Sequence, residues 1–204
     1  MSDYIGADGF FKKGPGVTQI EMHHEASVLE SARHLLTETT GLKTDEHGMD
    51  TPKRFVKMLR ELTTPEDIKW KVFPASGDEM VSVYNIPFVS LCNHHVVPFI
   101  GLAHIGYVPE KLEAGLSKFA RVVKWHAAGL QVQERLTSQV AKWLELHLDP
   151  KGLIVVMEAE HLCMTIRGVH SPGTKTRTTS VKGVFADHDR TAKAEFLAGL
   201  NGRH

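Results

Sequence analysis

The fold is decided where three short runs follow one another: Met80-Val-Ser-Val-Tyr84, Phe88-Val-Ser-Leu91 and Ile100-Gly-Leu-Ala-His-Ile-Gly-Tyr-Val108. Valine, isoleucine and aromatic residues, which favour the extended backbone, dominate these runs. Before them, apolar residues recur with the spacing of helices. The change near residue 80 therefore predicts that helices come first in the chain and that a β-sheet begins here.

Two helices are expected upstream of these strands. One covers residues 25–39 and ends before Gly41, and the other begins at Thr51, an N-cap residue followed by a proline in the first turn. We expect residues 1–24 to form a flexible tail, 25–79 an N-terminal helical region, and 80–204 one domain that carries the strands. A chain of 204 residues is long enough for one such domain with a real core.

Helices and strands are also expected after residue 108. The pattern predicts helices at 116–128, 132–148 and 187–200, and strands at 153–158, 164–169 and 174–185. Between Val132 and Leu148 an apolar residue recurs every four positions, so one face of that helix is expected to be buried. Helices followed by strands, with further helices inserted between hairpins, indicate an α+β fold.

Composition restricts the function. The chain carries 24 lysines and arginines and 24 aspartates and glutamates, so no overall charge favours nucleic acid or a membrane surface. No apolar run approaches the ~18 residues of a membrane span, and the first residues do not resemble a secretion signal. We therefore expect a cytoplasmic protein that binds neither nucleic acid nor membrane. Any anionic substrate must be held by a local group of cations.

The two cysteines of the chain both stand beside histidines, in Cys92-Asn-His-His95 and His161-Leu-Cys163. Cys92, His95 and Cys163 are three ligands that suit zinc, and three protein ligands leave the fourth position of a catalytic site open. The alternatives are a disulfide, which a chain without a secretion signal disfavours, and two small buried core residues. Neither alternative explains why both cysteines stand beside histidines.

Histidines and cations lie near these presumed ligands. His94 and His161 are candidates for proton transfer near neutral pH, or for orienting the metal ligands. Lys118 and Arg121 are three residues apart near the start of an expected helix, which suits a phosphate group; a solvated positive face is the alternative. Arg167 follows Cys163 closely and is a candidate to complete such an anion site.

A carboxylate, Glu134, lies at the start of the next expected helix, in Gln131-Val-Gln-Glu-Arg-Leu-Thr137. A carboxylate accepts two parallel hydrogen bonds, which matches the ring N–H and exocyclic amino group of guanine. The ordinary preference of acidic residues for helix N-termini explains it equally well. Both interpretations remain open on these residues alone.

Together, the motifs resemble those of the GTP cyclohydrolase I family. The resemblance runs in order from about Thr51 to the C-terminus, and its motifs are Ser90-Leu-Cys-Asn-His-His95, Pro98-Phe99, His104-Ile-Gly-Tyr-Val-Pro109, Gly115-Leu-Ser-Lys118, Gln131-Val-Gln-Glu-Arg-Leu-Thr137, Glu158-Ala159, His161-Leu-Cys-Met164 and Arg167-Gly168. It implies the tunnelling fold, a four-stranded antiparallel sheet with helices on one face. It also implies a homodecamer of two stacked pentamers with active sites between subunits, and makes residues 80–204 the catalytic domain.

The resemblance also implies a role for each matching residue. Zinc would be held by Cys92, His95 and Cys163, and protons would be moved by His94 and His161. Ser117 would lie near the ribose, and Glu134 with Gln133 would bind the guanine. Four cations would hold the triphosphate: Lys118, Arg121, Arg167 and Arg54. The implied reaction opens the guanine ring at C8, releases C8 as formate, and rearranges the ribose to give 7,8-dihydroneopterin triphosphate for pterin biosynthesis.

One residue departs from the family pattern. The family usually has a glutamate between the cysteine and the two histidines, where this chain has Asn93. An amide resembles a carboxylate in shape but carries no charge and accepts no proton at neutral pH. This departure motivates the alternative of a non-catalytic or partially active nucleotide-binding relative. A second alternative is a nitrile reductase on the same fold, which would need a nucleophilic cysteine and a nicotinamide cofactor.

Overall fold

The computed structural model describes residues 19–186 and 191–201, with side chains described for 25–186 and 191–200. Most of the predicted tail and the predicted start of the last helix, at 187–190, lie outside the described residues. The chain divides into two compact units, Met1–Asp67 and Ile68–His204. Among the described helices, none is both long and apolar enough to cross a membrane.

The first unit contains the two predicted helices, α1 (Gln19–Thr40) and α2 (Thr51–Thr63), but α1 begins within residues 1–24, which were expected to form a tail. Helix α1 ends at Thr40 and is followed by Gly41, whose positive φ of 68° suits a residue without a side chain. Helix α2 begins at Thr51 itself, so Asp50 takes the N-cap position expected for Thr51. Arg60 of α2 forms a two-point ion pair with Glu25 of α1. Because both side chains are exposed, this ion pair contributes little to stability.

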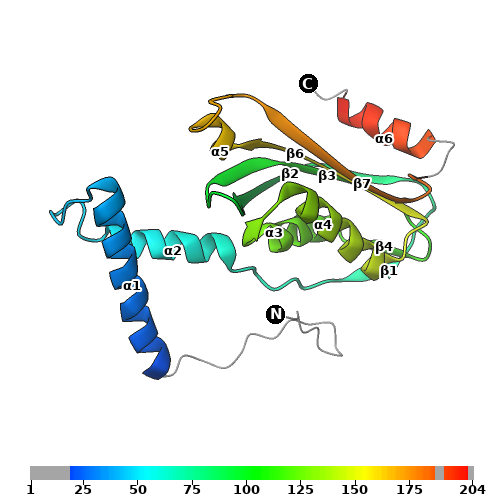
Figure 1. Ribbon diagram of the computed structural model, residues 1–204. Coiled ribbons are helices and arrows are strands. Elements are labelled where there is room, and N and C mark those ends of the chain that lie inside the picture. Colours follow the sequence, from blue (N-terminus) through cyan, green and yellow to red (C-terminus); the bar gives the residue numbers. More distant parts are fainter. Residues whose placement is uncertain (1–18, 187–190, 202–204) are drawn as a thin grey trace. The chain divides into compact units, whose positions relative to one another are not determined.

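The second unit is built on a sheet whose four long strands are antiparallel in the order β2-β3-β6-β7 (Figure 1). These strands are β2 (Val81–Cys92), β3 (Pro98–Val108), β6 (Gly152–His161) and β7 (Lys175–Gly183). The expected four-stranded antiparallel sheet is therefore confirmed. A two-residue strand, β5 (Leu130–Gln131), pairs parallel to the end of β2, and β1 (Val72–Pro74) pairs with β4 (Leu112–Ala114) in a separate small sheet.

The first two predicted strands, 80–84 and 88–91, are parts of the single strand β2. The pairing of β2 with β3 shifts register between Val83 and Ile86, where Asn85 has a positive φ of 58°. The backbone N–H of Asn85 donates to Nδ1 of the buried His104 at 3.2 Å. A bulge thus bends the strand without ending it, which an interruption in the apolar pattern cannot reveal.

Helices cover the sheet from both sides (Figure 1). Helices α3 (Ser117–Ala127) and α4 (Gln133–Leu148) bury Phe119, Leu136 and their apolar neighbours against one face. Helix α6 (Thr191–Asn201) packs Phe196 and Leu200 on the opposite face, over Ile154 and Val156. The expectation that helices lie on one face is therefore correct for α3 and α4 and wrong for α6.

The strand predicted at 164–169 does not form. A short helix, α5 (Leu162–Thr165), follows β6 directly, and a loop follows the helix. Glu160 closes this loop, because its carboxylate accepts from the Thr165 hydroxyl at 2.9 Å and from the Gly173 N–H at 3.1 Å. The apolar residues Ile166 and Val169, which suggested a strand, are exposed.

Candidate metal centre and active site

Two chain reversals bring Cys92, His95 and Cys163 together. Strand β2 ends at Cys92, and the following turn closes through a 2.9 Å hydrogen bond from the Val96 N–H to the Cys92 carbonyl. Strand β6 ends at His161, so Cys163 lies in the first turn of α5. The ligand atoms of the three residues all lie within 4.8 Å of one another. The sequence prediction of this cluster agrees with the geometry.

The spacing of these atoms fits a metal ion. The two Sγ atoms are 4.0 Å apart, and Nδ1 of His95 is 3.9 Å from Sγ of Cys92. Ligands at zinc distances in a tetrahedral site lie roughly 3.6–3.8 Å apart, so the three atoms would move closer together around a bound ion. Burial raises the pKa of the Cys163 thiol, and the neighbouring Cys92 raises it further. Two thiols this close need a cation before both can ionise.

The same reversals place His161 beside the cluster. His161 lies opposite Phe99 in the β3–β6 register, and the two rings stack with centroids 4.7 Å apart. Nε2 of His161 is 2.8 Å from Oε1 of Gln133, at the start of α4. Burial lowers the pKa of His161, and the nearby Glu134 carboxylate opposes that change. This histidine is therefore held at both its ring face and its ring edge.

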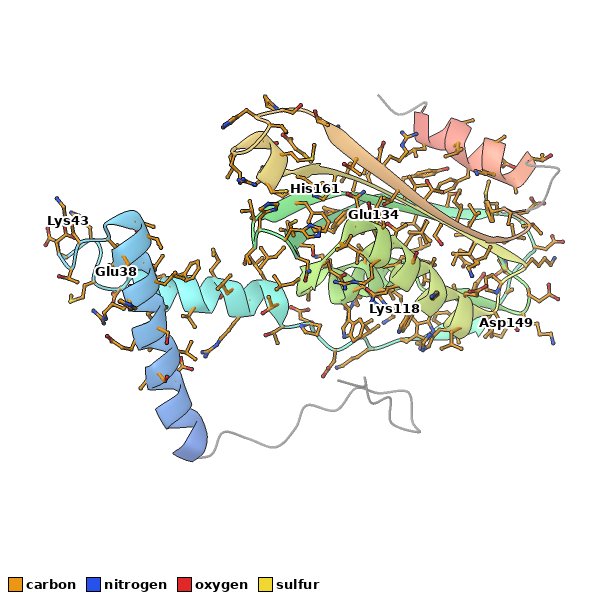
Figure 2. All side chains as sticks on the ribbon, in the orientation of Figure 1. Glu38, Lys43, Lys118, Glu134, Asp149 and His161 are labelled. Carbon is orange, nitrogen blue, oxygen red and sulfur yellow. The ribbon has the colours of Figure 1, made fainter. Side chains whose placement is uncertain are left out.

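The remaining polar candidates at this end of the sheet are exposed. Glu134 and His94 are both exposed, and Nδ1 of His94 lies 3.7 Å from Sγ of Cys92. Figure 2 labels His161 on β6 and Glu134 on α4. Asn93 is exposed as well, and its backbone N–H donates to the Gln131 carbonyl at 2.9 Å, which ties the turn to β5. The metal cluster therefore has carboxylate and imidazole groups around it.

The predicted phosphate-binding cations come from both units of the chain. Ser117 and Arg121 are exposed and Lys118 is half-buried at the start of α3, with Lys118 labelled in Figure 2. Within the described residues, the side chains of Lys118, Arg121 and Arg167 form no hydrogen bond or ion pair. Arg167 is exposed, and its charge acts on Cys163 to lower the pKa of that thiol. Arg54 lies in the first unit, where it pairs with Asp50 at 3.6 Å.

Three residues of the site were not predicted from the sequence: Phe99, Thr137 and Thr178. Phe99 stacks on His161, while the Thr137 and Thr178 hydroxyls are 2.7 Å apart and surround Gln133. Threonines on a strand and on a buried helix face usually indicate only local propensity. The inward position of Thr178 on β7 depends on strand register, so no local signal distinguishes it.

Two thiols and an imidazole around one point, with an oriented histidine beside them, have the geometry of a metal-binding site. The chain belongs to the GTP cyclohydrolase I family, whose model matches residues 28–201. The "GTP cyclohydrolase 1" of Streptococcus thermophilus strain CNRZ 1066 is 46% identical over 177 residues, covering 83% of this chain and 94% of that protein. The protein of that name from Geobacillus sp. strain WCH70 is 44% identical over 187 residues, covering 88% and 99%.

A more distant similarity connects this chain to a solved structure. The archaeosine synthase QueF-Like in the apo form matches with a TM-score of 0.45 and 13% sequence identity. The match covers 53% of this chain and 97% of that one. A similarity of this size carries no weight for function.

Proposed function

We propose that this protein is a zinc-dependent GTP cyclohydrolase I, which converts GTP to formate and 7,8-dihydroneopterin triphosphate. The observation that carries the proposal is the convergence of Cys92, His95 and Cys163 within 4.8 Å, in a chain of that family. Two thiolates and one imidazole favour zinc over magnesium or calcium, which prefer oxygen ligands. When bound, such an ion activates water for hydrolysis near neutral pH.

The residues around the cluster supply the proton transfers and hold the base. His161, fixed by Phe99 and Gln133, exchanges protons with the guanine five-membered ring as it opens at C8. His94, next to Cys92, serves as the second proton-transfer group. The exposed carboxylate of Glu134 accepts hydrogen bonds from the guanine ring N–H and amino group, which orients C8 toward the metal ligands. The resemblance also implies a base-binding role for Gln133, whereas its side-chain amide is bonded within the protein.

The cations and Ser117 hold the rest of the nucleotide. Lys118, Arg121, Arg167 and Arg54 bind the triphosphate, and Ser117 contacts the ribose during its opening. The absence of intramolecular partners for the first three side chains, among the described residues, supports their use by an anion. The binding energy of the triphosphate then positions the reacting ring, because the cations and the base site hold opposite ends of one ligand.

Self-association into a homodecamer of two pentamers belongs to the same proposal. On the face that carries α6, the part of the sheet that α6 does not cover exposes Val89, Ile100 and Leu102, with 43%, 49% and 39% of their surfaces accessible. Strand β7 also lies at an edge of the sheet. Apolar faces and unpaired strand edges favour association with further copies. A cytoplasmic location is supported by the two free cysteines, since reducing compartments preserve thiols.

The test measures metal and products together. Purified protein supplied with zinc and GTP is expected to release formate and 7,8-dihydroneopterin triphosphate in equal amounts. Cys163→Ala is expected to lose zinc and activity together, because two protein ligands rarely retain a catalytic zinc. Met164→Leu, at the adjacent partly buried position, is the matched control that keeps both.

Two outcomes of this test would reject the proposal. Wild-type protein that holds zinc but releases no formate would support the non-catalytic or partially active alternative motivated by Asn93. Protein without zinc that reduces a nitrile with a nicotinamide cofactor would support the reductase alternative. The three converging ligands favour the cyclohydrolase over both.

A further inference from the structure

Gln133 is a buried glutamine whose polar atoms are all occupied. Its residue surface is 1% accessible, which is unusual for an amide side chain. Nε2 lies 3.1 Å from the carbonyl oxygen of Met157, 3.0 Å from that of Thr176 and 3.1 Å from the Thr178 hydroxyl. Oε1 lies 2.8 Å from Nε2 of His161. A glutamine of this kind connects α4, β6 and β7 to one histidine ring.

The orientation of the amide follows from its partners. Carbonyl oxygens only accept hydrogen bonds, so the amide NH2 must face Met157 and Thr176. A flipped amide would place its oxygen against both carbonyls and lose both bonds. The amide oxygen therefore faces His161, and a 2.8 Å contact with an acceptor needs a hydrogen on the ring nitrogen.

We infer that Gln133 is a positioning residue that fixes the ring orientation and the tautomer of His161, with the hydrogen on Nε2. The inference rests on the proposed function of His161 as a proton-transfer group.

The surrounding contacts make the amide a rigid support. The Thr137 hydroxyl donates to the backbone carbonyl of Gln133 at 2.9 Å and is hydrogen-bonded to the Thr178 hydroxyl at 2.7 Å. Phe99 stacks on the face of the His161 ring, with an interplanar angle of 1°. Because both donors and the acceptor of the Gln133 side chain are used within the protein, recognition of the base falls to Glu134. The inference thus replaces the base-binding role of Gln133.

The test separates kcat from KM. Gln133→Met keeps the length of the side chain and removes its polar atoms, so both tautomers of His161 become available. We expect kcat to fall by at least about tenfold, with KM for GTP unchanged within about twofold. Gln131→Met is the matched control, because Gln131 is also a buried glutamine with hydrogen bonds, to the His126 carbonyl and Gln139, but without contact to His161. It is expected to retain the wild-type kcat and KM.

A second variant distinguishes loss of the contact with His161 from a general loss of folding. Gln133→Asn keeps an amide among the carbonyl groups but withdraws it from His161 by about one carbon–carbon bond, and the same loss of kcat is expected. A raised KM with unchanged kcat in either variant would instead assign Gln133 to direct binding of the base. Unchanged kcat and KM would remove any role. Neither result affects the proposed function, which is tested separately on the wild-type protein by its zinc content and its products.

Discussion

Acid should destabilise this protein through one buried histidine, His126. His126 lies in the last turn of α3, and its Nε2 has no hydrogen-bond partner among the described residues. Burial lowers its pKa from the ordinary 6.5 to about 4, and the neighbouring His147 contributes in the same direction. The Trp125 ring packs edge-on against it, with centroids 4.7 Å apart. The folded protein thus holds this imidazole neutral where the unfolded chain would protonate it.

The sign and size of the effect follow from these two pKa values. Above pH 6.5 neither state binds the proton, so His126 makes stability independent of pH there. Between pH 6.5 and about 4 only the unfolded state binds it, so stability falls as the pH falls. A shift of this size corresponds to a loss of about 3 kcal/mol at pH 4, of which about 2 kcal/mol is already lost at pH 5.

The measurement compares urea unfolding of the wild type and His126→Leu at pH 7, 5 and 4, at one protomer concentration. The wild type should lose about 3 kcal/mol more than the variant between pH 7 and 4. His47→Leu, at an exposed position, is the control and should follow the wild type at every pH. Parallel pH dependence of the wild type and His126→Leu would refute the reasoning, since His126 would then contribute nothing to acid sensitivity.

Three further predictions concern the base site, the departure from the family pattern and the core. Glu134→Gln keeps the shape of the side chain but loses its charge, and KM for GTP should rise by about 10- to 100-fold with metal content unchanged; an unaltered KM would leave Glu134 as an ordinary helix-terminal acid. Asn93→Glu, which restores the family residue, should preserve or raise kcat, whereas a large fall would mean that the site is tuned around the amide. Phe196→Ala should lower the free energy of unfolding by about 3–5 kcal/mol in urea titrations, because Phe196 is fully buried between Tyr84 and Phe185; a loss below about 1 kcal/mol would show that α6 contributes little to the core.

Periodicity in the sequence predicted most of the elements, because long helices and strands repeat their apolar residues many times. Helix α4 is an example, since its four-residue repeat corresponds to a face buried from Leu136 to Leu148. The predictions failed where one or two residues determine the local backbone structure. Two strands were predicted where the structure has one strand with a bulge at Asn85. A strand was predicted at 164–169, where the structure has α5 and a loop closed by the Glu160 hydrogen bonds. Such features depend on single contacts, which leave no repeat in the sequence.

The sequence by itself identified the candidate metal ligands. Cysteine is rare in this chain, and both cysteines stand beside histidines, so the candidates Cys92, His95 and Cys163 needed no structure. Local spacing carries this information because two of the three ligands come from a single turn.

Only the tertiary structure decided which groups surround these ligands and in what state. Cys92 and Cys163 are 71 positions apart, and the antiparallel register that pairs Phe99 with His161 brings them together. The same packing buries Gln133 against two backbone carbonyls, which sets the direction of its amide and the hydrogen on His161. A residue type states which hydrogen bonds a side chain is able to form, whereas only its folded neighbours determine which ones it does form.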